Sequence, residues 1–143
     1  MSQPNEELAR QLHQAWQAAW KREHGGERRM KPVKQDQQWI RRNGTNEVDI
    51  AATDFRDLPT DWQAENLASA KAAIDIVQQL KREGKSLNDE ATLEEASARL
   101  HVNWLSRNGS WASAIQRRPY NRLPEPEKEK DRVVIRLAIQ LVG

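Results

Sequence analysis

Two segments of this chain occur twice, in the same order, and they constrain the fold more than any single residue does. Residues 7–16 align without gaps onto residues 95–104, and residues 58–77 align without gaps onto residues 123–142. The positions that carry the match are Glu7, Leu12, His13, Trp16, Leu58, Pro59, Ala73, Ile74 and Val77 in the first copy and Glu95, Leu100, His101, Trp104, Leu123, Pro124, Ala138, Ile139 and Val142 in the second. Such repetition marks a structural unit used twice, and equivalent faces of the two copies tend to meet at a pseudo-twofold axis. A pocket on that axis would be lined by paired residues.

Apolar side chains recur at helical spacing in both copies of both segments. The helices that this spacing predicts cover residues 5–23, 59–82, 93–107 and 124–142. Gly25 and Gly84 follow the first two helices and are expected to end them. Thr92 and Glu95 have the spacing of a capping box, which predicts the start of the third helix.

The segments between these helices are polar and irregular, with a short helix expected at residues 35–42 and a brief strand at residues 48–50. The predicted fold class is therefore all-α, with two pseudosymmetric helix-loop-helix repeats packed as one compact four-helix unit with long irregular loops. The first repeat is expected at residues 1–83, with a long basic loop at 25–57, and the second at residues 84–143. Each half, at roughly 70 residues, would be only marginally stable alone, so the halves are expected to pack together as one compact domain overall.

The composition excludes several kinds of chemistry. The chain has no cysteine, which excludes disulfides, and its three histidines lack an acidic cluster, so neither a metal nor a cofactor is expected. It has no long apolar run and no signal peptide, which favours a cytoplasmic protein that does not contact membranes. It also lacks a glycine-rich phosphate loop and a nucleophile motif, so the sequence predicts a protein that is not an enzyme.

Two motifs in the second half resemble a known family. One is Leu100-His101-x-x-Trp104, and the other is PYNRLPEPEKEKDR at residues 119–132. Both are similar to the repeat domain named after the ryanodine receptors, in which a His-x-x-Trp helix and a basic loop precede a Leu-Pro-x-x-Glu-Lys-x-x-Asp-Arg helix. Leu12-His13-x-x-Trp16 and Leu58-Pro59 mark the first half as a divergent copy. The segment Asn108-Gly109-Ser110-Trp111 replaces the family's usual Gly-Trp step.

This resemblance implies binding rather than catalysis. Tandem repeats of the family form a pseudosymmetric helical unit and have been associated with adenine nucleotides, and small versions are similar to those of bacteria and phages. The likeness implies that Trp16 and Trp104 face each other across the pseudo-axis. In a phage, such a module would by analogy sequester an immune signal made from cyclic nucleotides or ADP-ribose.

The paired aromatic residues are the leading site candidates. Trp16 and Trp104 each lie one helical turn after a histidine, and an aromatic side chain stacked on a base contributes about 1–3 kcal/mol. The alternative is that both tryptophans only join the two halves. His13 and His101 are candidates to bind a phosphate or a ribose hydroxyl, against a purely structural role as hydrogen-bond donors.

Polar residues complete the expected ligand-binding set. Asn66 and Asp131 share one repeat position, from which each could read an adenine edge or a ribose. Helix capping is the alternative for both, and a local ion pair is a further one for Asp131 with Arg132. The arginines of the set are Arg132, Arg117 and Arg118, and Arg41 and Arg42 are further candidates to bind phosphate.

The sequence thus predicts non-catalytic binding of a small adenine-nucleotide-like ligand between the two repeats. The expected ligand belongs to the class of ADP-ribose, cyclic ADP-ribose or a cyclic nucleotide. One alternative is a protein–protein interaction module that uses the tryptophan-rich face. Another is a single-stranded nucleic-acid binder, which the net charge of +2 does not favour. The oligomeric state, including a homo-oligomer, stays open.

Overall fold

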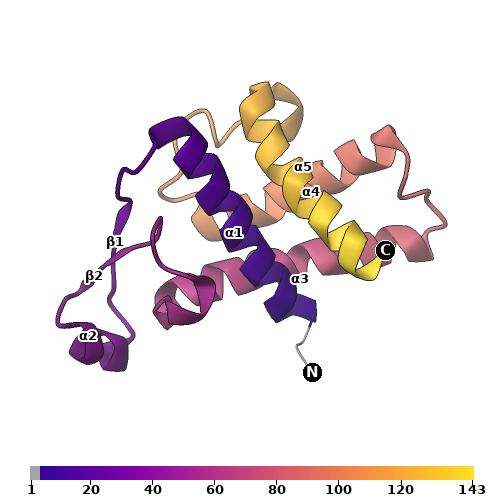
Figure 1. Cartoon of the computed structure of the whole chain (residues 1–143). Helices are drawn as coiled ribbons and strands as arrows, with labels where there is room; N and C mark the ends of the chain where they lie inside the picture. Colours follow the sequence, from indigo (N-terminus) through magenta and orange to yellow (C-terminus); the bar gives the residue numbers. More distant parts are fainter. Residues whose placement is uncertain (1–3) are drawn as a thin grey trace. The chain divides into compact units, whose positions relative to one another are not determined.

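The computed structural model describes residues 4–143, and most of these residues are helical (Figure 1). The elements in chain order are α1 (Pro4–His24), β1 (Met30–Pro32), α2 (Gln37–Asn43), β2 (Glu47–Asp49), the 3₁₀ turn η1 (Phe55–Asp57), α3 (Thr60–Arg82), α4 (Glu90–Asn108), the 3₁₀ turn η2 (Tyr120–Arg122) and α5 (Glu125–Val142). The four long helices lie where the apolar spacing predicts them. The mainly helical character of the chain is therefore confirmed.

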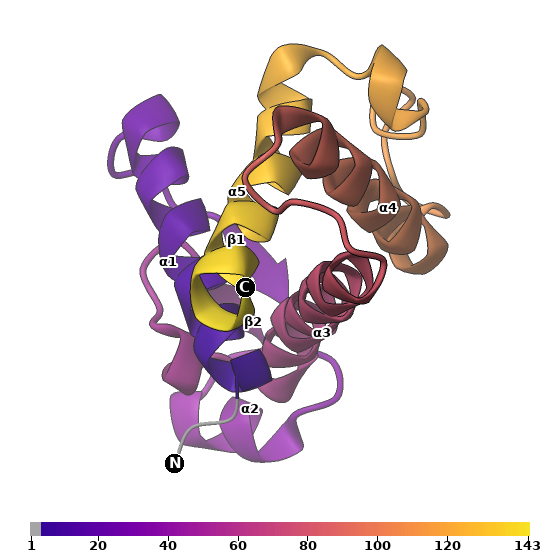
Figure 2. The same ribbon diagram turned by 90° about the vertical axis from the view of Figure 1, so that its right-hand side faces the viewer.

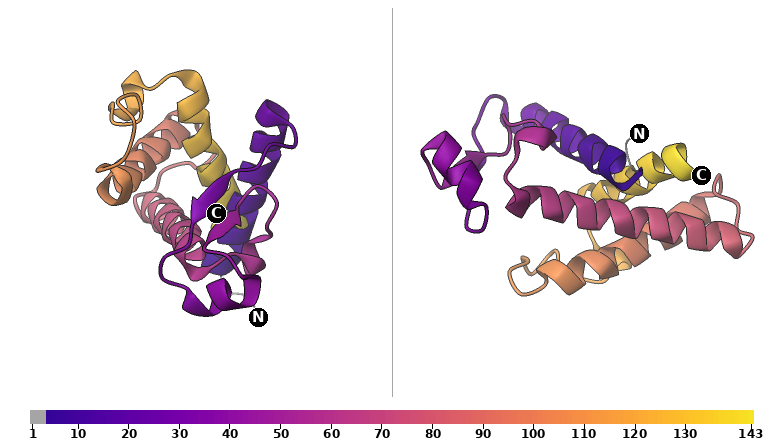
Figure 3. Two further views of the ribbon diagram at one scale, coloured as in Figure 1. Left: turned by 90° about the vertical axis from the view of Figure 1, so that its left-hand side faces the viewer. Right: turned by 90° about the horizontal axis from the view of Figure 1, so that it is seen from below.

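The segment between α1 and α3 is more ordered than its polar composition indicates. β1 pairs with β2 in an antiparallel register in which Lys31 lies opposite Val48. Figure 3 shows the two strands side by side in the purple part of the ribbon. The sequence predicts only the second strand, since β1 has three residues and ends in a proline, which cannot donate a backbone hydrogen bond. The short helix expected at residues 35–42 is present as α2 and the brief strand as β2, while the expectation of an irregular loop around them was wrong where β1 forms.

The start of α4 corrects a second expectation. The helix begins at Glu90, after Asp89, so Thr92 lies inside the first turn and is buried. The side chain of Glu95 binds Lys85 at 2.7 Å instead of reaching back to a backbone N–H group. The predicted capping box is therefore wrong. The predicted helix ends are confirmed at Gly25 and Gly84, whose φ values of 62° and 76° lie in the left-handed region that glycine adopts most easily.

The chain divides into two compact units, one that ends at Ala68 and one that begins at Ser69. The boundary falls inside α3. In the first unit, α1 packs on η1. In the second unit, α4 packs on α5 and on η2 (Figure 2). The predicted repeat boundary after residue 83, the pseudosymmetry and the packing of both halves as one domain stay predictions.

Two aspartates hold the hairpin segment of the first unit on the start of α3. Asp61 accepts hydrogen bonds from the backbone N–H groups of residues 34–36, at 3.0, 3.0 and 3.1 Å. Asp36 in turn accepts from the backbone N–H groups of Trp39 and Thr60, both at 3.0 Å. Asp36 thus caps the start of α2 and binds the first residue of α3, while Asp61 binds the three residues that lead into α2.

We expect Asp61→Ala to lower the free energy of unfolding by about 1–2 kcal/mol, because three amide donors lose their acceptor. Asp54→Ala is the matched control, since Asp54 makes no side-chain cap bond at the start of η1. Urea denaturation of both variants at pH 7 measures the effect. An equal loss of stability in the two variants would contradict this role for Asp61.

The contribution of Asp61 to the free energy of unfolding should also depend on pH. Burial alone would raise the pKa of Asp61, but the backbone hydrogen bonds outweigh it and hold the pKa below its usual range. A lowered pKa in the folded state stabilises the protein above the unfolded-state pKa, and this stabilisation is lost as the pH falls through the folded-state value. The difference between the wild type and Asp61→Ala should therefore shrink in acid.

Candidate functional site

The His-x-x-Trp motif of α1 fixes a loop to the helix. The Nε2 atom of His13 lies 2.7 Å from the carbonyl oxygen of Thr53. Because a carbonyl can only accept, Nε2 donates this hydrogen bond. The rings of His13 and Trp16 are stacked, with centroids 6.2 Å apart and an angle of 10° between the planes. Burial holds the pKa of His13 below its usual range, so the ring stays neutral at pH 7.

The motif of α4 has the same local geometry. His101 Nε2 lies 2.8 Å from the carbonyl oxygen of Arg118, and the rings of His101 and Trp104 are stacked at 6.4 Å and 10°. In each unit the accepting carbonyl belongs to the residue two positions before a 3₁₀ turn. Both histidines are buried. Their Nε2 atoms are thus engaged by the main chain, which leaves Nδ1 as the ring nitrogen for any further partner.

Trp16 and Trp104 differ in the further aromatic side chains that contact them. In α1 the rings form a row in which Trp20 stacks on Trp16 at 5.5 Å and 22°, and His24 stacks on Trp20 at 3.9 Å and 29°. In α4 the side chain of Trp104 meets Trp111 edge-on, at 5.7 Å and 71°. Trp111 is 62% exposed, and Trp104 is partly exposed. Trp104 thus has a stacked ring on one side and an aromatic edge beside it.

The loop that follows α4 carries positive charge without compensating acid. Residues 96–124 contain no Asp or Glu, although the chain has 21 of them among 143 residues. Of the arginines of this stretch, Arg99 and Arg107 lie on α4, where Arg99 pairs with Glu83 and Glu95, and Arg117, Arg118 and Arg122 lie in the loop. Arg117 closes the loop by donating to the carbonyls of Gly109 and Ser110, at 3.0 and 3.3 Å. The exposed side chains of Arg118 and Arg122 bind no other residue in the described part of the chain.

Asp131 lies beside the histidine of the same unit. Its Oδ2 atom is 3.7 Å from Nδ1 of His101. Burial, reinforced by the nearby charge of Glu127, raises the pKa of Asp131 to about 7. The counterpart in the first unit is Asn66, whose amide donates at 3.3 Å to the carbonyl of Trp62, one turn earlier in α3. The two equivalent positions therefore make different contacts.

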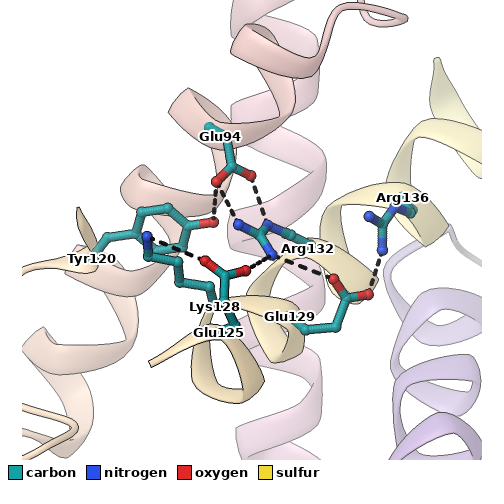
Figure 4. A network of polar contacts seen from close by, with 7 residues as sticks. All are labelled: Glu94, Tyr120, Glu125, Lys128, Glu129, Arg132 and Arg136. Carbon is teal, nitrogen blue, oxygen red and sulfur yellow. Dashed lines mark hydrogen bonds and ion pairs between the residues drawn. The ribbon is translucent and has the colours of Figure 1, made fainter. Parts of the chain in front are cut away.

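Arg132 is occupied by contacts within the protein (Figure 4). Its Nε and Nη2 atoms each lie 2.7 Å from an oxygen of Glu94, and its Nη1 atom lies 2.8 Å from Glu125. Tyr120 donates to the same Glu94 carboxylate at 3.1 Å. This network ties α4 to α5 and to η2. The arrangement uses Arg132 for structure, and its place in the predicted ligand-binding set stays untested.

Some of the predicted site residues lie together. The second unit brings together His101, Trp104, Asp131 and the main chain of Arg118, and the first unit stacks His13 on Trp16. Because Trp16 and Trp104 belong to different units, a base held between them stays a prediction. Arg41 and Arg42 lie exposed on α2. Trp111 was not among the predicted site residues, although it lies three residues after the end of α4, inside the stretch without acidic residues.

Three further observations concern the rest of the described residues. A groove of about 430 Å³ in the second unit is lined by Ala72, Asp75, Ile76, Arg99, Val102, Asn103 and Ser106. Among residues 4–143, no group of three or more His, Asp or Glu side chains is arranged to hold a metal ion. None of the described helices combines the length and apolarity that a membrane span requires.

Comparison with known proteins adds no relative to this picture. No protein-family model, no curated protein and no solved structure matches the chain. The resemblance to ryanodine-receptor repeats therefore rests on the motifs alone and stays a prediction.

We expect Asp131→Asn to stabilise the protein at pH 8 by about 1–2 kcal/mol. A carboxyl whose pKa is raised in the folded state binds its proton more tightly there than in the unfolded chain. Wild-type stability should therefore fall as the pH rises from about 4 to about 7. The asparagine side chain does not titrate, so the variant should lack this pH dependence. Denaturation of both proteins between pH 5 and 8 measures it, with the exposed Asp75→Asn as the control. A wild-type stability that changes with pH no more than that of Asp131→Asn would contradict this assignment.

Proposed function

We propose that the chain binds a small adenine-nucleotide-like ligand without converting it. The base stacks on Trp104, and the phosphates pair with arginines of the loop that follows. The observation that carries this proposal is the setting of Trp104. Its ring is partly exposed, stacked on the buried His101, and bordered edge-on by Trp111 within an arginine-rich stretch without acid.

The proposed architecture is a pair of related repeats, and matching contacts support it. The donor histidine, the stacked tryptophan and the accepting carbonyl before a 3₁₀ turn occur in both units with nearly equal distances. The Leu-Pro step after each turn also has the same backbone form, with φ and ψ of −68° and 147° at Leu58 and −73° and 147° at Leu123. A sequence duplication that keeps both hydrogen bonds and dihedral angles favours a common structural unit.

A rigid stacking surface suits a planar ligand. His101 is fixed by its hydrogen bond to the main chain, so the ring stacked on it loses little freedom when a base binds. Offset stacking and edge contacts are the two favoured geometries of aromatic rings, and a base on Trp104 beside Trp111 would make both. Both geometries support a base on this surface.

Anion binding is assigned to Arg118 and Arg122. A guanidinium offers two parallel donors that match phosphate oxygens, and these two side chains have no competing carboxylate among the described residues. The backbone of Arg118 is held against His101, which keeps the arginine near the stacking surface. A nucleotide fits this combination better than a neutral nucleoside.

The contacts of the two histidines support the proposal of binding without catalysis. The Nε2 atoms of both histidines donate to main-chain carbonyls, so neither atom can accept a proton as a general base. Binding without conversion would withhold the ligand from other proteins, which is the sequestering role that the resemblance implies.

A second candidate function is docking of a protein partner on residues 109–118. Trp111 and Ile115 of this loop are 62% and 45% exposed, and exposed aromatic and arginine side chains often dominate protein interfaces. Such a function would use Trp111 more than Trp104. It would require no nucleotide.

We expect Trp104→Ala to weaken nucleotide binding about 10–100-fold, since stacking of a base contributes about 1–3 kcal/mol. Isothermal titration calorimetry against ATP, ADP-ribose, cyclic ADP-ribose and cyclic dinucleotides measures it. Val102→Ala is the matched control, because Val102 lies on the same helix and is 67% exposed. Absence of binding to every nucleotide of this panel would refute the proposed function.

We expect Arg118→Gln to weaken the binding of phosphorylated ligands about tenfold, because a charged hydrogen bond contributes about 1.5 kcal/mol or more. Binding of adenosine should change little. The control is Arg82→Gln, which removes an exposed arginine at the end of α3. An equal loss for adenosine and for the phosphorylated ligand would show that Arg118 does not bind phosphate.

A further inference from the structure

We infer that the two repeats differ as binding sites, and that only the second takes the ligand, as a purine stacked on Trp104. In the first repeat, the protein's own Trp20 covers the corresponding tryptophan. This inference rests on the proposed function and specifies which repeat acts and which class of base it prefers.

The register of the duplication identifies the difference. Continuing the alignment of residues 7–16 with residues 95–104 along the two helices places Trp20 opposite Asn108. In α1, Trp20 stacks on Trp16 at 5.5 Å and 22°. In α4, the amide of Asn108 donates to the carbonyl of Trp104 at 3.1 Å, so the equivalent position supplies no ring.

Trp20 is held in place by several contacts. Its Nε1 atom donates to the carbonyl of Glu27 at 2.9 Å. The guanidinium of Arg29 lies 5.9 Å from its ring centroid, and His24 stacks on it at 3.9 Å. The indole is therefore a fixed part of the first repeat, which would have to lose these contacts before a ligand could replace it.

The second repeat leaves the corresponding place to a ligand. Trp111 meets Trp104 at 71°, so it borders the ring instead of lying flat on it. A ligand stacked on Trp104 would reproduce the contact that Trp20 makes with Trp16. An indole has two fused rings, as a purine does, whereas a pyrimidine has one and would cover less of the surface. A purine nucleotide is thus the better match.

The number of sites tests this inference. Calorimetry of the wild type with the tightest-binding nucleotide of the panel should give one site per chain. Trp16→Ala should keep the affinity within about threefold, while Trp104→Ala should lose binding about 10–100-fold. Trp20→Ala should expose Trp16 and raise the number of sites toward two. The double variant Trp20→Ala with Trp104→Ala should keep one weak site.

A measurement on the wild type covers the case in which a variant fails to fold. In a nuclear magnetic resonance titration, the indole N–H signals of Trp104 and Trp111 should shift on nucleotide binding, while those of Trp16 and Trp20 stay in place. Equal losses in Trp16→Ala and Trp104→Ala would overturn the inference and favour one base held by both rings. So would a folded Trp20→Ala variant that still binds one equivalent. If the wild type binds no nucleotide of the panel, the proposed function fails as well.

Discussion

The hydrogen bond from a buried histidine to a loop carbonyl is the contact on which each half of this protein depends. It fixes the loop that precedes a 3₁₀ turn, and that turn leads through a Leu-Pro step into the next helix. It also fixes the imidazole face on which a tryptophan stacks. A buried histidine N–H group without an acceptor would destabilise the fold. Its hydrogen bond to the carbonyl therefore constrains the positions of the helix, the loop and the stacked tryptophan together. One interaction thus couples the fold of each half to its candidate binding surface.

The helices were predictable because their signal is local. Apolar residues at a period of 3.6 mark one face of a helix wherever the chain lies, and the glycines after α1 and α3 supply the left-handed residue that ends each helix. β1 was not predictable on this basis, because a strand of three residues that includes Pro32 has no clear period. The start of α4 was misplaced because Asp89 and Thr92 are both suitable caps, and sequence alone does not decide between them.

The candidate site was predictable only in part. The repeated His-x-x-Trp motif identifies the rings that stack, since residues three apart share a helix face. The edge contact of Trp111 depends on how the loop of residues 109–118 turns, and Arg117 is one of the residues that hold this turn, by binding Gly109 and Ser110. The sequence carries no simple signal for that closure. The structural use of Arg132 was also hidden, because Glu94 lies 38 positions away in the chain.

The long stretch without acidic residues has a kinetic consequence. Uncompensated guanidinium groups such as those of Arg118 and Arg122 create a positive potential that reaches beyond direct contact, and this potential draws anions toward the surface. Added salt shortens its reach to about 10 Å at 0.1 M ionic strength. Dissolved ions would therefore slow the arrival of an anionic molecule more than they would speed its departure, which depends on close-range contacts.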